Sequence, residues 1–439
     1  MKEHNTVGTA RLTSFFDAGT FVELGAYISR PGEEKTAEGV VCGYGSLQGR
    51  LVFAFAQDST SMKGALDIRH AEKIARTYEK AISLGAPMVG FFDCAGAMVF
   101  DGASALAGYG KLLSIVSTAS GVIPQIAVIS GKCVGTMASV AALFDLTVVQ
   151  RDKGELYVTS PSLLEKVQNS TADYALANGN AALAVENESE AFATVKKLLA
   201  YLPDHEEQGV PELDTADDAN RALTLADRVT AIEALNAAVD AGSFVELFAE
   251  YGTAAKVGFA SIAGVSTVVL ALDGELDVKS IAKMRRMLVL ADAMGLPTVT
   301  FLNAKGVVGN AESEAALASE LASLAMVEAE GCAPRVTAIV GDAVGAGFIF
   351  GGSRALGADV VLALPGAQIA ALDAPAAVAF LWNDRITPEL SREALENEWR
   401  ETKADPVLAA ADGEVDDIIA PAELRARLAA ALFMLVDKE

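Results

Sequence analysis

The sequence predicts an α/β fold that occurs twice in the chain. Short apolar runs rich in β-branched residues alternate with longer segments of helical periodicity, and this alternation is typical of parallel β/α crossovers. The octapeptide DAGTFVEL at 17–24 returns as DAGSFVEL at 240–247. Three later positions also recur 210 residues further on, Pro87 as Pro297, Gly96 as Gly306 and Gly135 as Gly345. A constant distance across separate motifs indicates a duplicated domain.

The chain has 439 residues, which is enough for two such domains with a core each. Residues 203–220 are acidic, contain two prolines and a glycine, and lack apolar periodicity. Such a segment is typical of an exposed connector. We therefore expect a first domain at 1–205, a connector at 206–220 and a second domain at 221–439.

Each half is expected to run through the same elements in order. An apolar stretch around a glycine, at 39–57 and at 257–273, predicts a β-hairpin. Amphipathic segments at 68–84 and 278–294 predict helices that end at a Gly-x-Pro sequence. Further strands are expected at 87–93, 124–130 and 146–150 in the first half, and at 297–303, 334–340 and 358–364 in the second.

The composition excludes several classes of function. A formal net charge of −24 argues against nucleic acid and anionic membrane surfaces as partners, because both attract Lys and Arg. The four cysteines match no metal-ligand spacing, so we expect no bound metal and a reducing compartment. The first ten residues hold no apolar signal segment, and later apolar runs fall short of membrane-spanning length. A cytoplasmic protein is expected.

Two glycine turns in each half carry the candidate chemistry. They are Ala95-Gly96-Ala97 and Val134-Gly135-Thr136 in the first half, and Lys305-Gly306-Val307 and Val344-Gly345-Ala346 in the second. A glycine lets a ligand oxygen approach the backbone, and two such turns can direct two N–H donors at one point, forming an oxyanion hole. Glycines that end strands are more often simple turn formers. Their equal spacing in both halves favours the functional interpretation.

Basic residues on one predicted helix face form a second candidate site. Arg69, Lys73, Arg76 and Lys80 share this face, and Lys63 precedes it. Lys279, Lys283 and Arg286 repeat the first three positions. The face could be merely solvated, or it could contact an acidic partner or a phosphate-bearing ligand, with Lys63, Arg69 and Lys73 as the residues that would contact the phosphates.

The sequence offers few competing catalytic groups. The three histidines His4, His70 and His205 lie far apart and none has a recognisable triad context. Cys94 and Cys133 flank the first-half turns. No histidine or clear base accompanies either cysteine, so we interpret both as small buried residues.

At these turns the sequence resembles the carboxyltransferase subunits of biotin-dependent acyl-CoA carboxylases and decarboxylases of the acetyl-, propionyl-, methylmalonyl- and glutaconyl-CoA type. The family motifs D-S-G-G-A-R-I-Q-E-G and G-P-C-A-G-G-A match residues 93–102 and 131–137. Its motifs G-F-L-P-G and Y-G-G-A correspond loosely to 306–309 and 344–347. The resemblance spans nearly the whole chain and implies two tandem crotonase-like domains, each a β-β-α spiral.

The resemblance also implies a mechanism and partners. Biotin on a separate carrier protein delivers the carboxyl group and then, as its ureido anion, removes the α-proton of a short acyl-CoA. The backbone at Gly96-Ala97 and Gly135-Thr136 would hold the thioester enolate, and that at Gly306-Val307 and Gly345-Ala346 would polarise biotin. The expected assembly is a homo-oligomer, a dimer or a hexameric trimer of dimers. The implied partners are a biotin carboxyl carrier protein and either a biotin carboxylase or a membrane decarboxylase subunit.

The sequence departs from the family pattern in ways that keep two alternatives open. Ala95 and Thr136 replace glycines, Met98 stands where an arginine is usual, and Lys305 replaces a proline. These changes leave room for a structural carboxyltransferase-like subunit with reduced or lost activity. A crotonase-type hydratase or isomerase that works without biotin is the other alternative, although no paired glutamates follow the first-half turns.

Overall fold

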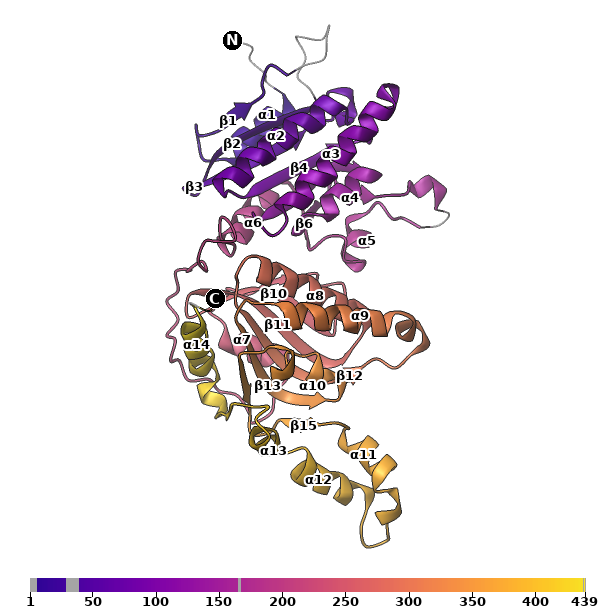
Figure 1. Ribbon diagram of the computed structural model, residues 1–439, viewed down its shortest axis with the longest axis vertical. Helices are drawn as coiled ribbons and strands as arrows, with labels where there is room; N and C mark the ends of the chain where they lie inside the picture. Colours follow the sequence, from indigo (N-terminus) through magenta and orange to yellow (C-terminus); the bar gives the residue numbers. More distant parts are fainter. Residues whose placement is uncertain (1–5, 29–38, 165–166, 437, 439) are drawn as a thin grey trace. The chain divides into compact units, whose positions relative to one another are not determined.

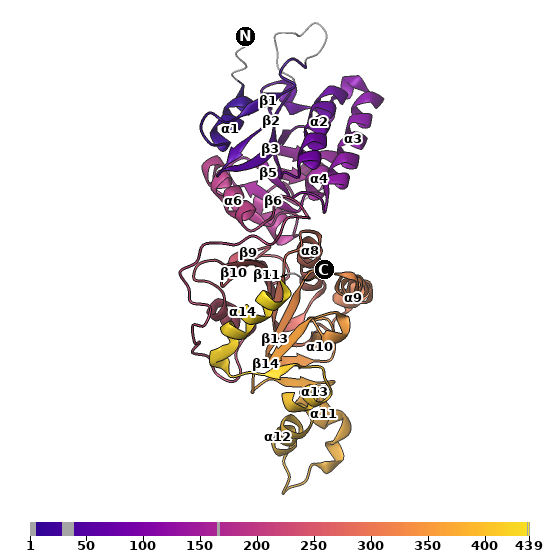
Figure 2. The same ribbon diagram turned by 60° about the vertical axis from the view of Figure 1, so that its left-hand side comes forward.

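The computed structural model describes residues 6–28, 39–164, 167–436 and 438. The chain divides into two units, residues 1–209 and 210–439. Residues 211–213 of the expected connector are hydrogen-bonded to the second unit, since Leu213 N–H donates to Gly264 O and Ser266 N–H to Pro211 O. Figures 1 and 2 show both units.

The first unit is built on one mixed sheet with the strand order β1-β2-β3-β4-β5-β6-β8, and β7 pairs with β5. Its strands are β1 (Val22–Leu24), β2 (Val40–Leu47), β3 (Arg50–Gln57), β4 (Met88–Cys94), β5 (Gln125–Val134), β6 (Leu146–Gln150), β7 (Glu155–Tyr157) and β8 (Leu183–Val185). Its α-helices are α1 (Val7–Phe15), α2 (Ile68–Leu84), α3 (Ala103–Ala119), α4 (Thr136–Ala142), α5 (Ala172–Ala177) and α6 (Glu188–Ala200), and its 3-10 helices are η1 (Met62–Gly64), η2 (Val99–Asp101) and η3 (Pro161–Leu163).

The second unit repeats this sheet with the order β16-β14-β13-β12-β11-β10-β9, and β15 pairs with β13. Its strands are β9 (Val245–Leu247), β10 (Ala255–Ile262), β11 (Val265–Leu276), β12 (Thr298–Val307), β13 (Arg335–Val344), β14 (Val360–Ala363), β15 (Gln368–Ala370) and β16 (Asp417–Ile418). Its helices are α7 (Ala231–Ala238), α8 (Val278–Ala293), α9 (Ala311–Glu330), α10 (Ala346–Ile349), α11 (Ala374–Leu381), α12 (Arg392–Lys403), α13 (Pro406–Ala411) and α14 (Leu424–Leu435), with 3-10 helices η4 (Arg354–Leu356), η5 (Asn383–Arg385) and η6 (Pro421–Glu423).

The predicted elements are present in both halves. The hairpins β2–β3 and β10–β11 are antiparallel, and the strands that follow them pair in parallel, as the β/α alternation predicts. In Figure 1, α2 and α3 lie side by side over one face of the first sheet, and α8 and α9 do the same over the second. The predicted α/β fold class is confirmed.

Each unit has its own apolar core between the sheet and its helices. In the first unit α2 contributes a buried stripe that includes Ala71, Ile74 and Tyr78 and packs against the sheet. In the second unit α7 and α14 cover one face of the sheet, where Leu235 and Leu428 are fully buried. Burial of such side chains stabilises each unit by roughly 1.5–3 kcal/mol per large residue.

Candidate active site

In each unit two neighbouring parallel strands shift register and end side by side. The pairing of β4 with β5 shifts just before Cys94, which then lies beside Cys133. The pairing of β12 with β13 shifts at the equivalent place, so that Ala304 lies beside Ala343. Because the predicted glycine turns begin one residue after these paired residues, the two turns of each unit lie next to one another.

The four turn glycines adopt backbone conformations that L side chains rarely populate, and they do so in matched pairs. Gly96 and Gly306 have φ angles of 113° and 115°, and Gly135 and Gly345 have φ angles of 63° and 53°. A Cβ atom placed on Gly96 or Gly135 would meet nothing within 4 Å. These first-unit glycines are therefore required by backbone conformation and by open access rather than by packing.

In the first unit the residue after each glycine supplies the available donor. Gly135 N–H is already used, because it donates to Tyr157 O at 2.9 Å. Thr136, the first residue of α4, and Ala97 donate their N–H groups to no residue that the structure describes. Unpaired amides at a helix start can bind a negatively charged oxygen. The candidate oxyanion hole of the first unit therefore consists of the Ala97 and Thr136 amides.

The second unit repeats this arrangement with one difference from the prediction. Gly345 N–H donates to Ala370 O at 3.0 Å, and Ala346, the first residue of α10, has no acceptor among the described residues. Gly306 and Val307 belong to β12 and do not follow its end. Val307 is nevertheless equivalent to Ala97, because the residues that follow them are bonded in the same way. Met98 N–H donates to Leu66 O, and Val308 N–H donates to Leu276 O.

A side chain at the end of the first strand ties the two strands together in each unit. Asp93 Oδ1 accepts the Lys132 N–H at 3.1 Å, and Asn303 Oδ1 accepts the Asp342 N–H at 2.8 Å. The close approach leaves no room for a side chain on the second strand. A Cβ atom on Gly131 would lie 2.2 Å from Asp93 Oδ1, and one on Gly341 would lie 2.1 Å from Asn303 Oδ1.

A buried histidine, for which the sequence predicts no role, lies beneath the first turn. His70 is fully buried, and its Nε2 lies 3.2 Å from the Gln57 amide nitrogen. Gln57 Oε1 in turn accepts the Asp93 N–H at 3.1 Å. Burial lowers the pKa of His70 to about 3, so the ring is neutral at physiological pH. His70 therefore supports the strand end through Gln57 and does not face a ligand.

The cysteines near the turns are structural, as predicted. Cys94 and Cys133 are both fully buried. Burial raises the pKa of the Cys94 thiol to about 11, and burial also raises the pKa of the Cys133 thiol. Since the thiolate is the nucleophilic form, neither residue is poised for nucleophilic chemistry.

The structure separates the three predicted phosphate-binding residues. Lys63 is exposed, and its carbonyl oxygen accepts the Ala95 N–H at 3.1 Å, which places it beside the first turn. Arg69 is partly exposed near the start of α2. Lys73 is buried, and its Nζ donates to Glu23 Oε1 at 3.1 Å and Val40 O at 3.0 Å. Contrary to the prediction, Lys73 is not available to a phosphate, because it is used inside the unit.

The turn at Gly345 opens into a groove of about 740 Å³ in the second unit. Its walls include Ala346, the apolar side chains of Phe348, Ile349 and Leu408, and the charged side chain of Lys403. Mostly apolar concave surfaces of this size, with a few placed polar groups, are typical of small-molecule sites. The Ala346 amide therefore lies on the wall of a ligand-sized groove.

Comparison with known proteins agrees with this geometry. Residues 2–439 match the carboxyl transferase domain family. The chain belongs to this family. The predicted family resemblance is thus confirmed over nearly the whole chain.

Several characterised members of the family are similar along their length. The carboxyltransferase subunit of propionyl-CoA carboxylase from Haloferax mediterranei is 32% identical, and the match covers 98% of this chain and 90% of that protein. The methylmalonyl-CoA decarboxylase subunit alpha of Veillonella parvula is 33% identical, with 98% and 89% covered. The solved structure of transcarboxylase 12S, a hexamer with methylmalonyl-coenzyme A and methylmalonic acid bound, aligns with a TM-score of 0.90 at 28% identity, covering 98% of this chain and 90% of that one.

The described residues of this carboxyl transferase domain include no helix with the length and apolar character needed to cross a membrane.

Proposed function

We propose that this chain is a carboxyltransferase subunit that moves a carboxyl group between biotin on a carrier protein and the α-carbon of a short acyl-CoA. The observation that carries the proposal is the pair of matched turns in each unit, which offer backbone N–H donors at equivalent positions. Carboxyl transfer of this kind develops negative charge on two oxygens, one on the thioester and one on the ureido ring. Two duplicated oxyanion sites suit that requirement.

The first unit is proposed to hold the acyl-CoA. The Ala97 and Thr136 amides would stabilise the oxygen of the thioester enolate, and loss of one such donor typically lowers kcat by about 10²–10³. Lys63, which is exposed beside this turn, and the partly exposed Arg69 would bind the CoA phosphates.

The second unit is proposed to hold biotin. The groove at Gly345 has the volume for a bicyclic ring, and Ala346 and Val307 present their amides at matched positions. Biotin, when bound, supplies the carboxyl group and the base that takes the α-proton. Because biotin would supply the base, the chain needs no catalytic histidine. The buried His70 is therefore free to serve a structural purpose.

The proposed partners follow from the same chemistry. A biotinyl carrier protein must deliver the ring, and a biotin carboxylase or a membrane decarboxylase subunit would complete the cycle. We propose a homo-oligomer, a dimer or a trimer of dimers, because the similar transcarboxylase 12S is a hexamer.

Carboxyl exchange tests the proposal directly. The purified oligomer is incubated with free biotin or a biotinyl carrier and a panel of malonyl-, methylmalonyl- and glutaconyl-CoA. We expect carboxyl exchange with at least one ester, only when biotin is present. Inactivity with all of them would favour the structural-subunit alternative, and turnover without biotin would favour a hydratase or isomerase.

Gly135→Val tests the assigned hole. A Cβ at this position meets nothing within 4 Å, but a φ of 63° is strained for valine, so the turn should move. We expect exchange to fall by about 10²–10³. Gly49→Val, at a hairpin with a φ of 84° and equally open space, is the matched control and should keep activity. Full turnover in Gly135→Val would refute the site assignment.

Arg69→Glu tests the CoA phosphate contact. The Michaelis constant for the CoA ester should rise, while the apparent affinity for biotin stays unchanged. Arg76→Glu is the matched control, because this exposed arginine lies two turns further along α2. Equal Michaelis constants for the two variants would show that Arg69 is merely solvated.

A further inference from the structure

The two N–H donors of the proposed thioester site lie on different segments of the first unit, and the Asp93 carboxylate is bonded to both segments. Asp93 Oδ1 accepts the Lys132 N–H at 3.1 Å, four residues before Thr136 in the chain. Asp93 Oδ2 accepts the Ser59 hydroxyl at 2.5 Å. One side chain thus joins β5, which leads to the Thr136 amide, to the loop that follows β3.

The loop after β3 holds the segment that carries the other donor, the Ala97 amide. Lys63 O accepts the Ala95 N–H at 3.1 Å. Three residues further on, Leu66 N–H donates to Gly96 O at 2.8 Å. Leu66 and Ala97 are paired as a parallel bridge between the two segments. A shift of this loop would therefore shift the Ala97 amide.

This loop is longer in the first unit than in the second. Phe53 and Val268 donate equivalent bonds, each to the proline carbonyl before the next strand, and they lie 215 residues apart. Leu66 and Leu276 accept equivalent bonds from the residues after the turns, and they lie 210 residues apart. The first unit therefore has five additional residues between these points, in the loop that contains Ser59.

The longer loop has a strained backbone that must be held in place. Met62 and Lys63 have φ angles of 49° and 56°, a region that residues other than glycine rarely adopt. Such conformations persist only when surrounding contacts enforce them. Gly64 packs so tightly that a Cβ atom on it would lie 2.1 Å from Asp93 O. The loop is thus packed against the main chain of Asp93 and bonded through Ser59 to its carboxylate.

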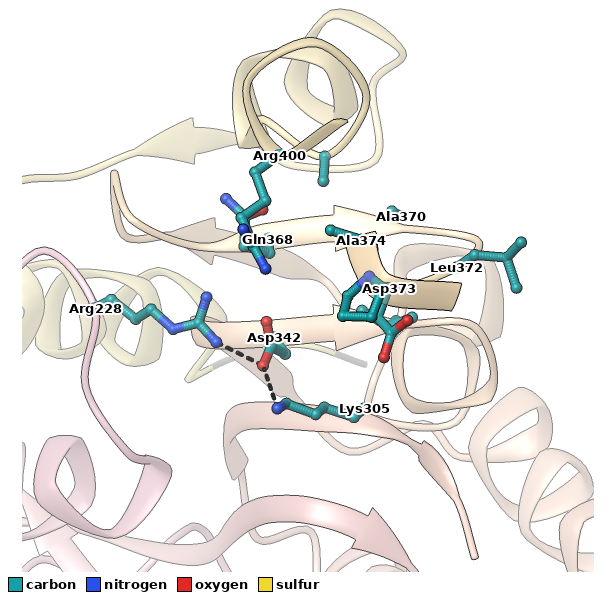
Figure 3. A pocket seen from close by; sticks show the side chains of 12 residues that line it. Arg228, Lys305, Asp342, Gln368, Ala370, Leu372, Asp373, Ala374 and Arg400 are labelled. Atoms are coloured by element: carbon teal, nitrogen blue, oxygen red, sulfur yellow. Dashed lines mark hydrogen bonds and ion pairs between the residues drawn. The ribbon is translucent and has the colours of Figure 1, made fainter. Parts of the chain in front are cut away.

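The second unit ties its strand ends in a different way. Asn303 Oδ1 accepts the Asp342 N–H at 2.8 Å, but its Nδ2 donates to a side chain of β11 and not to a loop. Asp342 Oδ2 also lies 3.8 Å from Lys305 Nζ, and Figure 3 shows this contact between the ends of β12 and β13. The first unit has Ala95 in place of Lys305 and cannot form this ion pair, so its strand ends depend more on Asp93.

We propose that Asp93 is the positioning residue of the thioester oxyanion hole and sets the distance between the Ala97 and Thr136 amides. This role rests on the proposed function, because the proposed function assigns these two amides to the thioester. A misplacement of about 1 Å can lower a rate by about 10²-fold. Loss of the carboxylate should therefore slow turnover and leave binding of the CoA portion unchanged.

Asp93→Ala tests this role in the purified oligomer, by carboxyl exchange with biotin and the ester that the wild-type protein accepts. We expect kcat to fall by about 10²-fold, with no change in the Michaelis constant for the ester. Asp93→Asn should restore most of the activity. Its amide oxygen can accept from Lys132, as Asn303 accepts at the same place in the second unit, and its amide nitrogen can donate to Ser59 Oγ.

Two further variants separate this role from stability. Asp145 Oδ2 accepts the Gln125 N–H at 2.7 Å at the other end of β5, so Asp145→Ala is the matched control and should keep full turnover. Ser59→Ala removes only the bond to the loop, at an exposed residue, and should lower kcat by about tenfold. It carries the test if Asp93→Ala fails to fold. Wild-type kcat in Ser59→Ala, or a loss in Asp93→Ala that Asp145→Ala matches, would overturn the proposal.

Infrared spectroscopy of a bound ester examines the hole without turnover. Propionyl-CoA with an isotope label at the thioester carbonyl should show a lower C=O stretching frequency on the wild-type protein than when free, because the two amides polarise the bond. Asp93→Ala should reduce this shift and Asp93→Asn should restore it. No shift on the wild-type protein would contradict the proposed thioester site itself. A full shift on Asp93→Ala would overturn the role of Asp93 alone.

Discussion

The two units share a turn geometry but support it with different chemistry. Beneath the first turn lie Gln57 and His70, two buried polar residues that contact one another. At the equivalent places beneath the second turn lie Leu272 and Ser280, both fully buried. The strand-end residue also differs, Asp93 in one unit and Asn303 in the other.

The difference shows which parts of the duplicated domain are constrained. Backbone angles at the turn glycines agree within 10° between the units, with φ of 113° and 115° at one turn and 63° and 53° at the other. The residues that support them have changed, from Gln57 and His70 in the first unit to Leu272 and Ser280 in the second. A backbone oxyanion site therefore depends on main-chain geometry, which several different cores can hold in place.

The largest expected effect concerns an ion pair that the second copy of the octapeptide has and that the first lacks among the residues the structure describes. Arg425 is fully buried, and its Nη2 contacts Asp240 Oδ1 at 2.6 Å. Arg425→Met would leave Asp240 buried without its cation, which typically costs about 3–5 kcal/mol of unfolding free energy. Urea unfolding followed by tryptophan fluorescence reports on this unit, since Trp382 and Trp399 both belong to it.

The matched control for that ion pair is in the first unit. Asp17, the counterpart of Asp240, accepts from Ser46 Oγ at 2.8 Å and from Gly49 N–H. Asp17→Asn should therefore lower the free energy of unfolding by less than Asp240→Asn does. Equal losses of unfolding free energy in the two variants would mean that Arg425 does not stabilise the second unit.

An intermediate effect is expected from His70, through pH. The folded pKa of His70 is about 3, below the ordinary histidine value of 6.5, so between these two values the unfolded state binds more protons. The neutral ring makes its full contribution to the free energy of unfolding above pH 6.5, and this contribution is lost as the pH falls toward 3. The slope from this residue is at most about 1.4 kcal/mol per pH unit.

Hydrogen exchange of α2 peptides measures this slope in the first unit. His70→Gln should flatten it, whereas His205→Gln, at a partly exposed histidine, should leave it unchanged. An unaltered slope in His70→Gln would show that other groups control the acid sensitivity of this unit.

The smallest effect is expected from the duplicated buried lysines. Lys73 pairs with Glu23, whereas Lys283 donates to Phe248 O at 3.1 Å and has no described carboxylate within 4 Å. Burial lowers the pKa of Lys283 to about 8. Lys73→Met should cost about 1–2 kcal/mol more than Lys283→Met, because it strands a carboxylate. Denaturant unfolding of both variants at neutral pH checks this, and a reversed order would contradict it.

Much of the fold was predictable because its signals are local. The hairpins, the helices ending at Gly-x-Pro and the turn glycines all follow from periodicity and from the constant distance between the copies. The burial of Lys73 was not predictable, because its partner Glu23 lies fifty residues earlier in the chain. Helical spacing shows which residues share a face, but not whether that face meets solvent.

The role of His70 was also missed, although a signal was present. His70 lies on the same helical stripe as Ile74 and Tyr78, and a histidine within an apolar stripe indicates burial. Its link to Gln57 depends on how α2 packs against β3, which the sequence does not specify.

The contact between Gly131 and Asp93 restricts how this protein can evolve. With only 2.2 Å available to a Cβ atom, no other residue can replace Gly131 until position 93 has first shrunk, and that step would release the two strands. The same holds for Gly341 and Asn303. Substitutions are therefore more readily accepted at the flanking positions. The two copies differ at one of these, which is Ala95 in the first unit and Lys305 in the second.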